Sequence, residues 1–431
     1  MDLTILIAVL VLLTWLTIRG ANLIVIAPIC AFILAILSGI NVWTVEPEGF
    51  THIYMAGFTS FFASWFLVFL FGSIFGKLME DSGAAEKVSH VIMSKVGSER
   101  AALAVILACG VLTYGGVSVF VVAFTAYPIA LSLFREAKLP RRFIPACLAF
   151  GSATFTMTTA GSPEIQNWIP IKYLETSPWA AWEISFPVAI VMFFMGYSWL
   201  KKMMATACAN GETFEDRAHD PHPELRNLPS FISSIIPLVA IVLVGFFTHD
   251  ILKQNALVLS LIVGCLLTYF LNIHHFKNVD GALHDGAYSA LIATGNTCAV
   301  VGFGALAKVT PGFDQAMAMV TTLPGGGLVS AAVAITFIAG ITGSASGGQS
   351  IALPELAPQY LADGVPADEL HRIVAISSGA LDSLPHNGYV VTTIRAICGE
   401  THKSAYGPVA ALTVVVPTLC LMLALALFAI F

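Results

Sequence analysis

The sequence predicts an all-α polytopic membrane protein built from two repeats of inverted topology. Three observations predict this class: an apolar composition, one polar segment near the middle of the chain, and a matched pair of helix-breaking seams inside apolar segments. Of the 431 residues, 57% are hydrophobic and 11% are charged, whereas a soluble domain carries roughly 25% charged residues. A soluble core of this size would not expose so little charge, so we expect a membrane-embedded chain.

Several stretches are long enough to cross the hydrocarbon core of a bilayer, which takes about 20 helical residues. The first of them lacks a preceding basic segment and a small-residue cleavage site, so we expect a retained helix rather than a signal peptide. The stretches include residues 3–18, 23–40, 55–75, 182–200, 231–247, 256–271 and 409–431.

Cysteine spacing and motifs exclude several other classes. The eight cysteines are dispersed and show no C-x-x-C spacing, so we expect neither structural disulfides nor a bound metal. The sequence has no H-E-x-x-H and no G-x-S-x-G motif, and an aspartic protease would need two buried aspartates. We therefore expect no enzyme activity, no cofactor apart from Na⁺ as a coupling ion, and no nucleic-acid partner.

One polar segment divides the chain close to its middle. Residues 201–227 hold nine charged side chains, which is typical of a linker outside the membrane. The expected organisation is a first repeat (1–200), a linker (201–228) and a second repeat (229–431).

The same order of elements recurs on both sides of the linker. Gly76 matches Gly304 and Gly115 matches Gly343, both at an offset of 228. In each half an amphipathic stretch is followed by an apolar arm, a glycine- and serine-rich tip and a returning arm, with the tips at residues 113–118 and 340–348. We expect each arm–tip–arm unit to be a re-entrant hairpin, so that each half has five transmembrane helices plus the hairpin.

The basic residues predict the orientation. Five spans are an odd number, so the second half is inverted relative to the first. With the N-terminus outside, 16 of the 20 Lys and Arg residues fall on the cytoplasmic side, and Lys172, Lys253, Lys308 and Arg372 fall outside. The positive-inside rule favours this arrangement. We expect a multi-pass protein of the cell (inner) membrane with both termini outside and residues 201–228 in the cytoplasm.

Two seams of small, hydroxylated and helix-breaking residues interrupt apolar segments, at residues 151–167 (the first break) and 376–388 (the second break). Hydrocarbon offers no water to backbone N–H and C=O groups, so a broken helix must be buried in protein or line a polar cavity. One glycine cluster alone would indicate a packing contact between helices. Two breaks at corresponding places in two halves indicate the binding site of a transporter for a small polar solute.

The candidate substrate-binding residues are glycines, hydroxyls and amides of the breaks and tips. Helix N-termini at the breaks present free N–H groups to an anion, while carbonyls and hydroxyls can hold sodium. Neither break contains Lys or Arg, so a carboxylate would be bound by N–H and hydroxyl donors. Singly, such hydroxyls usually bond the backbone four residues earlier. The candidates are Gly115, Ser118, Thr154, Thr156, Thr158, Thr159, Gly161, Ser162, Pro163, Gln166, Asn167, Ser344, Ser346, Ser377, Ser378, Gly379, Ser383, His386 and Asn387.

Asp382 is the main candidate for ion coupling, because it is the only acidic residue in the apolar stretch 373–394. An ionisable group there costs about 2.5–3.5 kcal/mol on insertion scales. Asp382 can carry a proton, bind sodium, or cap free N–H groups beside the break. His386 can titrate near neutral pH or serve as a plain hydrogen-bonding group. Glu164 is either part of the site or interfacial, and Asn296 either faces the site or joins helices.

Several runs of residues resemble a known family. The run Leu381-Asp-Ser-Leu-Pro-His-Asn-Gly388 is followed by Ile397-Cys-Gly-Glu-Thr-His-Lys403, and further similar runs cover residues 154–158, 163–170 and 296–304. Together they resemble the GntP-type permeases of the ion-transporter superfamily, over most of the chain and in the same order of elements. The likeness is closer to the branch for 3-hydroxybutyrate and related short acids than to the gluconate branch.

The resemblance implies secondary active symport of a small organic anion, such as a short hydroxy-monocarboxylate, with H⁺ or Na⁺. It also implies an elevator movement in a homodimer, in which the hairpins and broken helices travel past a scaffold of early spans. A monovalent cation/proton antiporter or a channel-like ion pathway is the alternative function.

Overall fold

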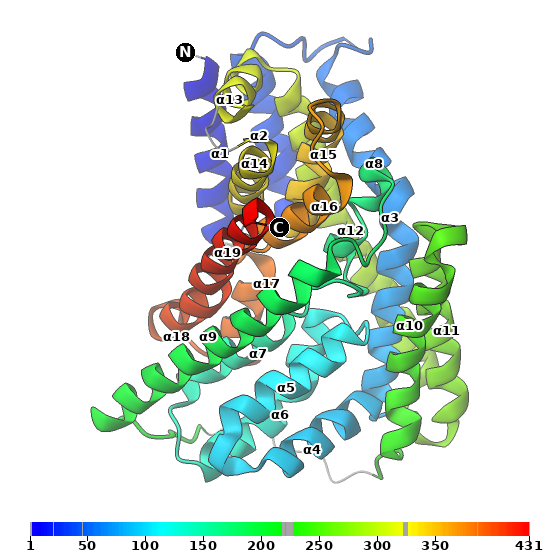
Figure 1. Ribbon diagram of the computed structural model, residues 1–431, viewed down its shortest axis with the longest axis vertical. Helices are drawn as coiled ribbons and strands as arrows, with labels where there is room; N and C mark the ends of the chain where they lie inside the picture. Colours follow the sequence, from blue (N-terminus) through cyan, green and yellow to red (C-terminus); the bar gives the residue numbers. More distant parts are fainter. Residues whose placement is uncertain are drawn as a thin grey trace.

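The computed structural model describes residues 2–19, 21–44, 46–217, 220, 227–321, 326–385 and 387–430. Within these residues every regular element is a helix (Figure 1), which confirms the all-α class. The α-helices of the first half are α1 (Asp2–Ile18), α2 (Leu23–Leu37), α3 (Phe50–Asp81), α4 (Ala84–Val96), α5 (Ala101–Tyr114), α6 (Val119–Glu136), α7 (Ile144–Ser152), α8 (Ile171–Leu174) and α9 (Trp182–Ala209).

The second half repeats this series after the linker. Its α-helices are α10 (Phe231–Leu252), α11 (Asn255–Leu271), α12 (Val279–Lys308), α13 (Pro311–Thr321), α14 (Gly326–Thr342), α15 (Ala345–Ala362), α16 (Ala367–Ser378), α17 (Gly388–Val391), α18 (His402–Ala410) and α19 (Val416–Ile430). Short 3-10 helices are η1 (Ser98–Arg100), η2 (Arg141–Phe143), η3 (Ile165–Asn167) and η4 (Ile273–His275), and η5 (Thr392–Ile397) and η6 (Ala411–Val415) are π-helical.

The two halves share one order of helices. Each has two apolar helices, then a long one of 32 or 30 residues, a short amphipathic one of 13 or 11 residues, and a pair of arms. A helix that ends early and a final long helical stretch complete each half. The expected order of elements is therefore present. The inverted relation of the halves and the re-entrant path of the arms stay predictions.

Several helices are long and apolar enough to cross a bilayer, which confirms a multi-pass membrane protein. By length and composition there are six of these among the described residues: α3, α6, α9, α10, α12 and the stretch from α18 to α19. Shorter apolar helices include α1, α2, α5, α11 and α14. Helix α6 qualifies by length although we expect it to be a returning hairpin arm, and the count of ten spans stays a prediction.

Helices α3 and α12 pack side by side along much of their length. Small residues allow this close approach, as is typical of membrane helices. A Cβ added at Gly57 would lie 2.5 Å from the Ala305 Cβ, and one added at Gly302 would lie 2.9 Å from the Tyr54 ring. Helices α1 and α2 cover α12 through a separate hydrophobic cluster, while α11 packs against α3 and α10 packs against α11 (Figure 1). Helices α1–α3 and α10–α12 thus form one layered framework.

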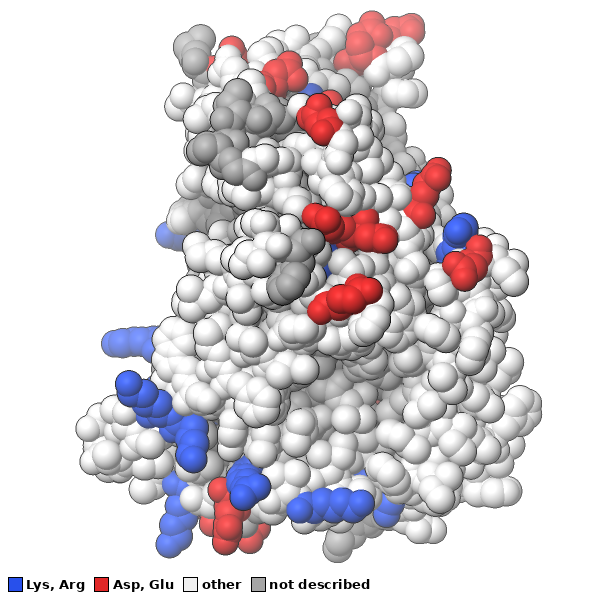
Figure 2. Space-filling model, in the orientation of Figure 1, with Lys and Arg blue, Asp and Glu red and all other residues white. Residues whose placement is uncertain are grey.

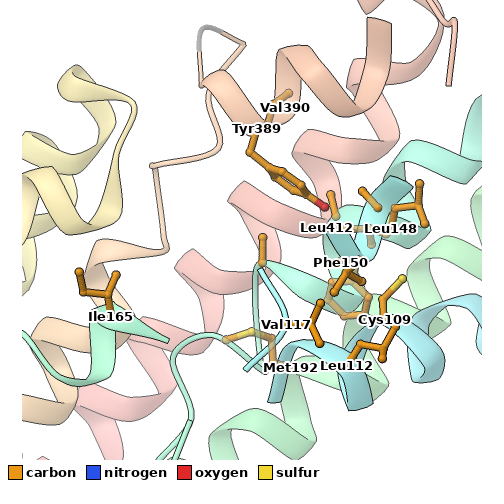
Figure 3. Packing of buried hydrophobic residues seen from close by; sticks show 14 of the residues in the cluster. Cys109, Leu112, Val117, Leu148, Phe150, Ile165, Met192, Tyr389, Val390 and Leu412 are labelled. Atoms are coloured by element: carbon orange, nitrogen blue, oxygen red, sulfur yellow. The ribbon is translucent and has the colours of Figure 1, made fainter. Parts of the chain in front are cut away.

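The breaks and arms pack around a second, larger hydrophobic cluster. Figure 3 shows Tyr389 and Val390 of α17 near Leu148 and Phe150 of α7, with further contributions from α5, α9 and η6. The Tyr389 hydroxyl forms a hydrogen bond of 2.8 Å with the Ser152 hydroxyl at the end of α7. Segments on either side of the linker therefore share one core.

The polar segment between the halves is partly docked onto the protein. Helix α9 continues to Ala209, so the first nine residues of the predicted linker are helical. Farther along, Asp220 forms a bidentate ion pair with Arg141 at 2.8 and 2.9 Å, and both side chains are only 6% exposed. Arg217 pairs with Glu400 at 2.8 Å. Through Asp220 and Arg217 the segment ties η2 to the chain after the second break.

Electrostatics explain why Asp220 can be buried there. Burial by itself would raise the pKa of the Asp220 carboxyl, but hydrogen bonds from Arg141 and the Arg217 amide, with the charges of Arg141 and Arg135, hold it below its ordinary value of 3.8. Asp220 is therefore ionised at neutral pH, and its pairing stabilises the docked linker.

Candidate functional site

A cavity of about 310 Å³ lies where both breaks, both tips and the helices α3 and α12 meet. No Lys or Arg is among the described residues that line it. Apolar groups cover part of its wall, and polar side chains converge on the rest. The polar lining residues are Ser73, Ser118, Glu164, Gln166, Asn296, Thr297, Ser344, Ser346, Asp382, Ser383, Asn387 and Tyr389.

The chain leaves helical geometry at both predicted breaks. Helix α7 ends at Ser152 and regular structure resumes only with η3 at Ile165. Helix α16 ends at Ser378 and α17 begins at Gly388. The predicted interruptions are therefore present in the structure, although each irregular segment is shorter than the run of polar residues that suggested it.

Most hydroxyls of the first break are bonded to its own backbone. Thr154 donates to the Phe150 carbonyl at 2.6 Å and Thr156 to the Gly151 carbonyl at 2.9 Å. Thr158 donates to the Thr154 carbonyl at 3.3 Å, and Thr159 similarly donates to the Phe155 carbonyl. This is the backbone bonding that Ser and Thr commonly show in membrane helices, and none of the four threonines lines the cavity.

The rest of the first break is held in shape by local contacts. Gly161 has a φ of +77°, and a Cβ added there would collide with the Trp179 ring. The Asn167 amide donates to the Ser162 carbonyl at 3.1 Å and to the Pro178 carbonyl at 2.8 Å. Gly161, Ser162 and Asn167 therefore brace the break, while Pro163, Glu164 and Gln166 reach the cavity.

The second break presents more of its polar groups to the cavity. Ser383 donates to Asp382 Oδ1 at 2.9 Å, and Asp382 is 6% exposed. Asn387 caps α17 by accepting from the Val390 amide at 2.9 Å, and its own amide donates to the Gly343 carbonyl at 3.0 Å. All three residues line the cavity. His386 lies outside the described residues.

Three other candidates of the second break lie behind the cavity wall. Ser377 donates to the Val374 carbonyl at 3.1 Å and Ser378 to the Ala375 carbonyl at 2.8 Å, so both are satisfied within α16. Gly379 packs against Met157 and Thr158 of the first break. These residues position the break rather than line the cavity.

The tips are narrower than expected. Helix α14 runs to Thr342 and α15 starts at Ala345, so only Gly343 and Ser344 of the predicted tip 340–348 are non-helical. Ser344 caps α15 by accepting from the Gly347 amide at 3.1 Å. Ser118, Ser344 and Ser346 line the cavity. Gly115 lies beside Leu238 of α10 instead, and its neighbour Gly116 takes the place at the cavity wall.

Several polar side chains that line the cavity have no hydrogen bond with the described part of the chain. The Ser118 and Asn296 side chains make no hydrogen bond with the described residues, and Gln166 Oε1 is buried without a partner. Asn296 thus faces the cavity from α12, whereas the neighbouring Thr297 hydroxyl donates to the Ala293 carbonyl at 3.1 Å. Unpaired polar groups in an apolar surrounding are costly unless a bound ligand or ion satisfies them.

Arg372 is the main residue that the sequence analysis missed. We counted it only among the basic residues of the outer side, and the structure shows its side chain fully buried in α16. Its guanidinium donates to the Thr158 carbonyl at 2.8 Å, Asn167 Oδ1 at 2.9 Å and the Ala180 carbonyl at 2.9 and 3.0 Å. A cation from the second half thereby satisfies the free carbonyls of the first break. A lone Arg at the start of a polar seam was the available signal.

Gln349 makes a second link of this kind. Its side chain in α15 is fully buried and donates to the Gln166 carbonyl at 3.0 Å and to the Ser378 hydroxyl at 2.9 Å. The arm of the second half is thus bonded to both breaks. With the Tyr389–Ser152 bond and Arg372, this joins the arms and breaks of the two halves into one body.

A polar cavity between broken helices, inside a bundle of apolar helices, is the arrangement of a membrane transport protein. The similarity of the chain to known proteins supports this class. The model of the GntP family permeases matches residues 1–266, and the chain belongs to this family. An uncharacterized transporter, YxjC, of Bacillus subtilis (strain 168) is 35% identical over 96% of this chain and 96% of its own length.

A second relative and a solved structure are less similar in sequence. The high-affinity gluconate transporter of Escherichia coli (strain K12) is 30% identical over 29% of this chain and 27% of its own length. Among solved structures, the Alcanivorax borkumensis YdaH transporter superposes with a TM-score of 0.56 at 15% identity, covering 99% of this chain and 97% of that one. The last likeness concerns the fold. The family confirms the resemblance read from the sequence and places the chain among transporters rather than enzymes.

Proposed function

We propose that this transporter is an ion-coupled symporter of a small organic acid anion, such as a short hydroxy-monocarboxylate. The observation that carries the proposal is the cavity itself, because both breaks, both tips and α12 contribute polar groups to one space. Its volume of about 310 Å³ is at the small end of ligand pockets, which range from about 300 to 1,000 Å³. A small solute fits that space.

The donors around the cavity suit a carboxylate. Ser344 and Asn387 begin helices α15 and α17, and the dipole of a helix is positive at its N-terminus. Ser118, which begins α6, and the Gln166 and Asn296 side chains add hydrogen-bonding groups that have no partner among the described residues. An anion would thus be held by hydrogen-bond donors rather than by a salt bridge.

The bonds between the halves support an elevator movement. Arms and breaks are tied together by Arg372, Gln349 and Tyr389, whereas α3 and α12 pack mainly with each other, with α2 and with α11. The first group would travel as a transport domain while the second stays as a scaffold. The arms would be re-entrant hairpins in inverted repeats, and the scaffold would form the contact of a homodimer.

Asp382 is the proposed coupling residue, and its cation is H⁺ or Na⁺. Asp382 lines the cavity, has no ion pair with the described residues and is bonded to the Ser383 hydroxyl alone among described side chains. A carboxylate in this apolar surrounding is stabilised when a proton or a sodium ion accompanies the solute.

Reconstitution in liposomes tests the function. A panel of short hydroxy acids and sugar acids, including 3-hydroxybutyrate and gluconate, is offered under separately imposed proton and sodium gradients. We expect gradient-driven accumulation of at least one acid. The alternative function, a cation/proton antiporter, is favoured instead if a monovalent-ion exchange signal arises while no organic acid accumulates.

The distribution of charge supports a cytoplasmic linker. Figure 2 shows Lys and Arg side chains gathered toward the end of the molecule at which α4 and the end of α9 lie in Figure 1, with Asp and Glu concentrated toward the other end. The positive-inside rule makes the basic end cytoplasmic. Cys208, at the end of α9, is exposed, so an impermeant maleimide should label it in inverted vesicles. Labelling from outside intact cells would reverse the orientation.

A further inference from the structure

The cavity holds a second carboxylate, Glu164, in the first break. The backbone N–H of Glu164 donates to the Ser162 hydroxyl at 3.3 Å, and the backbone carbonyl of Glu164 accepts from the backbone N–H of Asn167 at 2.9 Å. The backbone is therefore fixed on both sides. The carboxylate itself makes no hydrogen bond or ion pair with the described residues. Glu164 and Asp382 therefore approach one small space from opposite halves of the chain.

The formal charges around this space do not balance. Among the described residues that line the cavity, Glu164 and Asp382 are acidic, Tyr389 is a phenol, and none is basic. Arg372 lies behind the first break, where protein oxygens surround its guanidinium. Counting Arg372, the ionised site carries one net negative charge, and a bound acid anion makes it two.

A double negative charge cannot be carried through an apolar layer without large cost, because few groups there solvate it. Two monovalent cations make the loaded site neutral. One cation at Asp382 alone would leave the Glu164 carboxylate without a partner among the described residues, in a cavity that no described basic residue lines. The two carboxylates offer one place for each cation.

We propose that Glu164 is a second cation-coupling residue and that two monovalent cations accompany each acid monoanion. This inference rests on the proposed symport. On the outer side each carboxylate takes up one cation, a proton that forms an O–H bond or a sodium ion bound to its oxygens, and the acid binds. On the inner side the acid and both cations leave and the carboxylates are free again. Each cycle therefore moves one net positive charge inward.

Accumulation limits measure the number of cations. Proteoliposomes are held at zero membrane potential, and 3-hydroxybutyrate and gluconate serve as probes under tenfold gradients of protons alone, of sodium alone and of both together. Each coupled cation supports about tenfold accumulation under a tenfold gradient of that cation, since equal ratios correspond to equal free energies. Under both gradients we expect about hundredfold accumulation for the wild type and about tenfold for Glu164→Gln. The experiments with a single gradient identify each coupled cation.

Controls distinguish a failure of the second coupling site from a failure of the proposed symport. Glu183→Gln changes an exposed glutamate at the start of α9 and should keep the wild-type limit. Glu164→Gln should also retain counterflow of the probe acid and lose the inward current that the wild type shows. A wild-type limit of about tenfold, or a Glu164→Gln limit equal to the wild-type value, would overturn the second coupling site while leaving symport intact. If no acid accumulates in any arm, the proposed symport fails and this inference fails with it.

Discussion

The two breaks have similar compositions but different surroundings. In the first break the threonines bond their own backbone, and the side chains of Arg372 and Asn167 donate to its free carbonyls. In the second break Asp382 and Asn387 face the cavity, and only part of their hydrogen-bonding capacity is used by the protein. The first break is therefore mainly a braced structure, while the second provides more of the chemistry.

This difference shows why polar residues in a membrane segment should not be counted as site residues by type alone. A hydroxyl at a break first satisfies the nearest carbonyl, because an unpaired group in an apolar surrounding costs about 1–3 kcal/mol. Only groups that the local backbone cannot satisfy remain for a solute. The predictions below separate bracing residues from cavity residues, beginning with the largest effect.

Removal of the Arg372 guanidinium should have the largest effect, since it braces the first break. Arg372→Met leaves the buried oxygens of Thr158, Asn167 and Ala180 without their donor. We expect a loss of about 3–5 kcal/mol and little folded protein, measured by thermal melting in detergent. Arg395→Met, at an exposed arginine, is the matched control and should melt as the wild type does. A stable Arg372→Met protein would show that the brace is dispensable.

Asp382→Asn should lower gradient-driven accumulation about tenfold, to the limit that the cation at Glu164 supports, while solute exchange persists. The substitution keeps the shape and bonding of the second break but removes its charge. Accumulation and counterflow in proteoliposomes measure the two properties separately. If Asp382 only caps the break, Asp382→Asn should reach the wild-type accumulation limit and Asp382→Ala should be the variant that fails to fold. Wild-type accumulation by Asp382→Asn would transfer the coupling role to His386.

The linker offers a comparison of a buried ion pair with an exposed one. Asp220→Asn removes the charge facing Arg141 and should lower stability by about 2 kcal/mol at neutral pH. Asp216→Asn breaks the ion pair between Arg135 and Asp216, whose side chain is 71% exposed. This substitution should lower stability by about 0–1 kcal/mol. Because the pKa of Asp220 is lowered, its contribution is present above pH 3.8 and disappears as pH falls through the lower folded-state value. Equal melting temperatures for the two variants would contradict the docked linker.

Asn387→Ala tests the second break at a cavity residue without a charge. The side chain caps α17 and bonds the Gly343 carbonyl at 3.0 Å, so its loss disturbs the tip and the cavity together. We expect apparent affinity for the transported acid to fall by roughly fivefold, which corresponds to one hydrogen bond of about 1 kcal/mol. Initial uptake rates across acid concentrations measure it. An unchanged affinity would show that Asn387 is a structural cap alone.

Thr154→Val should have the smallest effect, although Thr154 stands in the more hydroxyl-rich break. Its hydroxyl donates a hydrogen bond to the Phe150 carbonyl, and its side chain does not line the cavity. We expect stability to change by less than about 1 kcal/mol and apparent affinity by less than about twofold. Thermal melting and uptake on the same preparation measure both. A strong affinity loss here would mean that the first break contributes more directly than its hydrogen bonds indicate.

The sequence predicted the positions of the breaks well and their contacts poorly. Gly, Pro and hydroxylated residues interrupt a helix through local backbone chemistry, so the irregular segments after Ser152 and after Ser378 could be located from composition. Which hydroxyls point into the cavity depends on the rotation of each segment against its neighbours. The candidate residues that line the cavity include Ser118, Gln166, Asn296, Ser344, Ser346, Asp382, Ser383 and Asn387. The candidates Thr154, Thr156, Thr158 and Thr159 do not line it.

By itself the sequence determined the membrane class, the order of elements in two halves and the two interruptions, because hydropathy and helix breaking are properties of short stretches of chain. Only the tertiary structure decided the partners of Arg372, Gln349 and Asp220, since each bonds to segments more than 25 residues away or across the linker. It also brought Glu164 beside the cavity that Asp382 lines. A buried polar group bonds the donor or acceptor that tertiary packing places beside it. The packing of distant segments cannot be predicted from the composition of short stretches of chain.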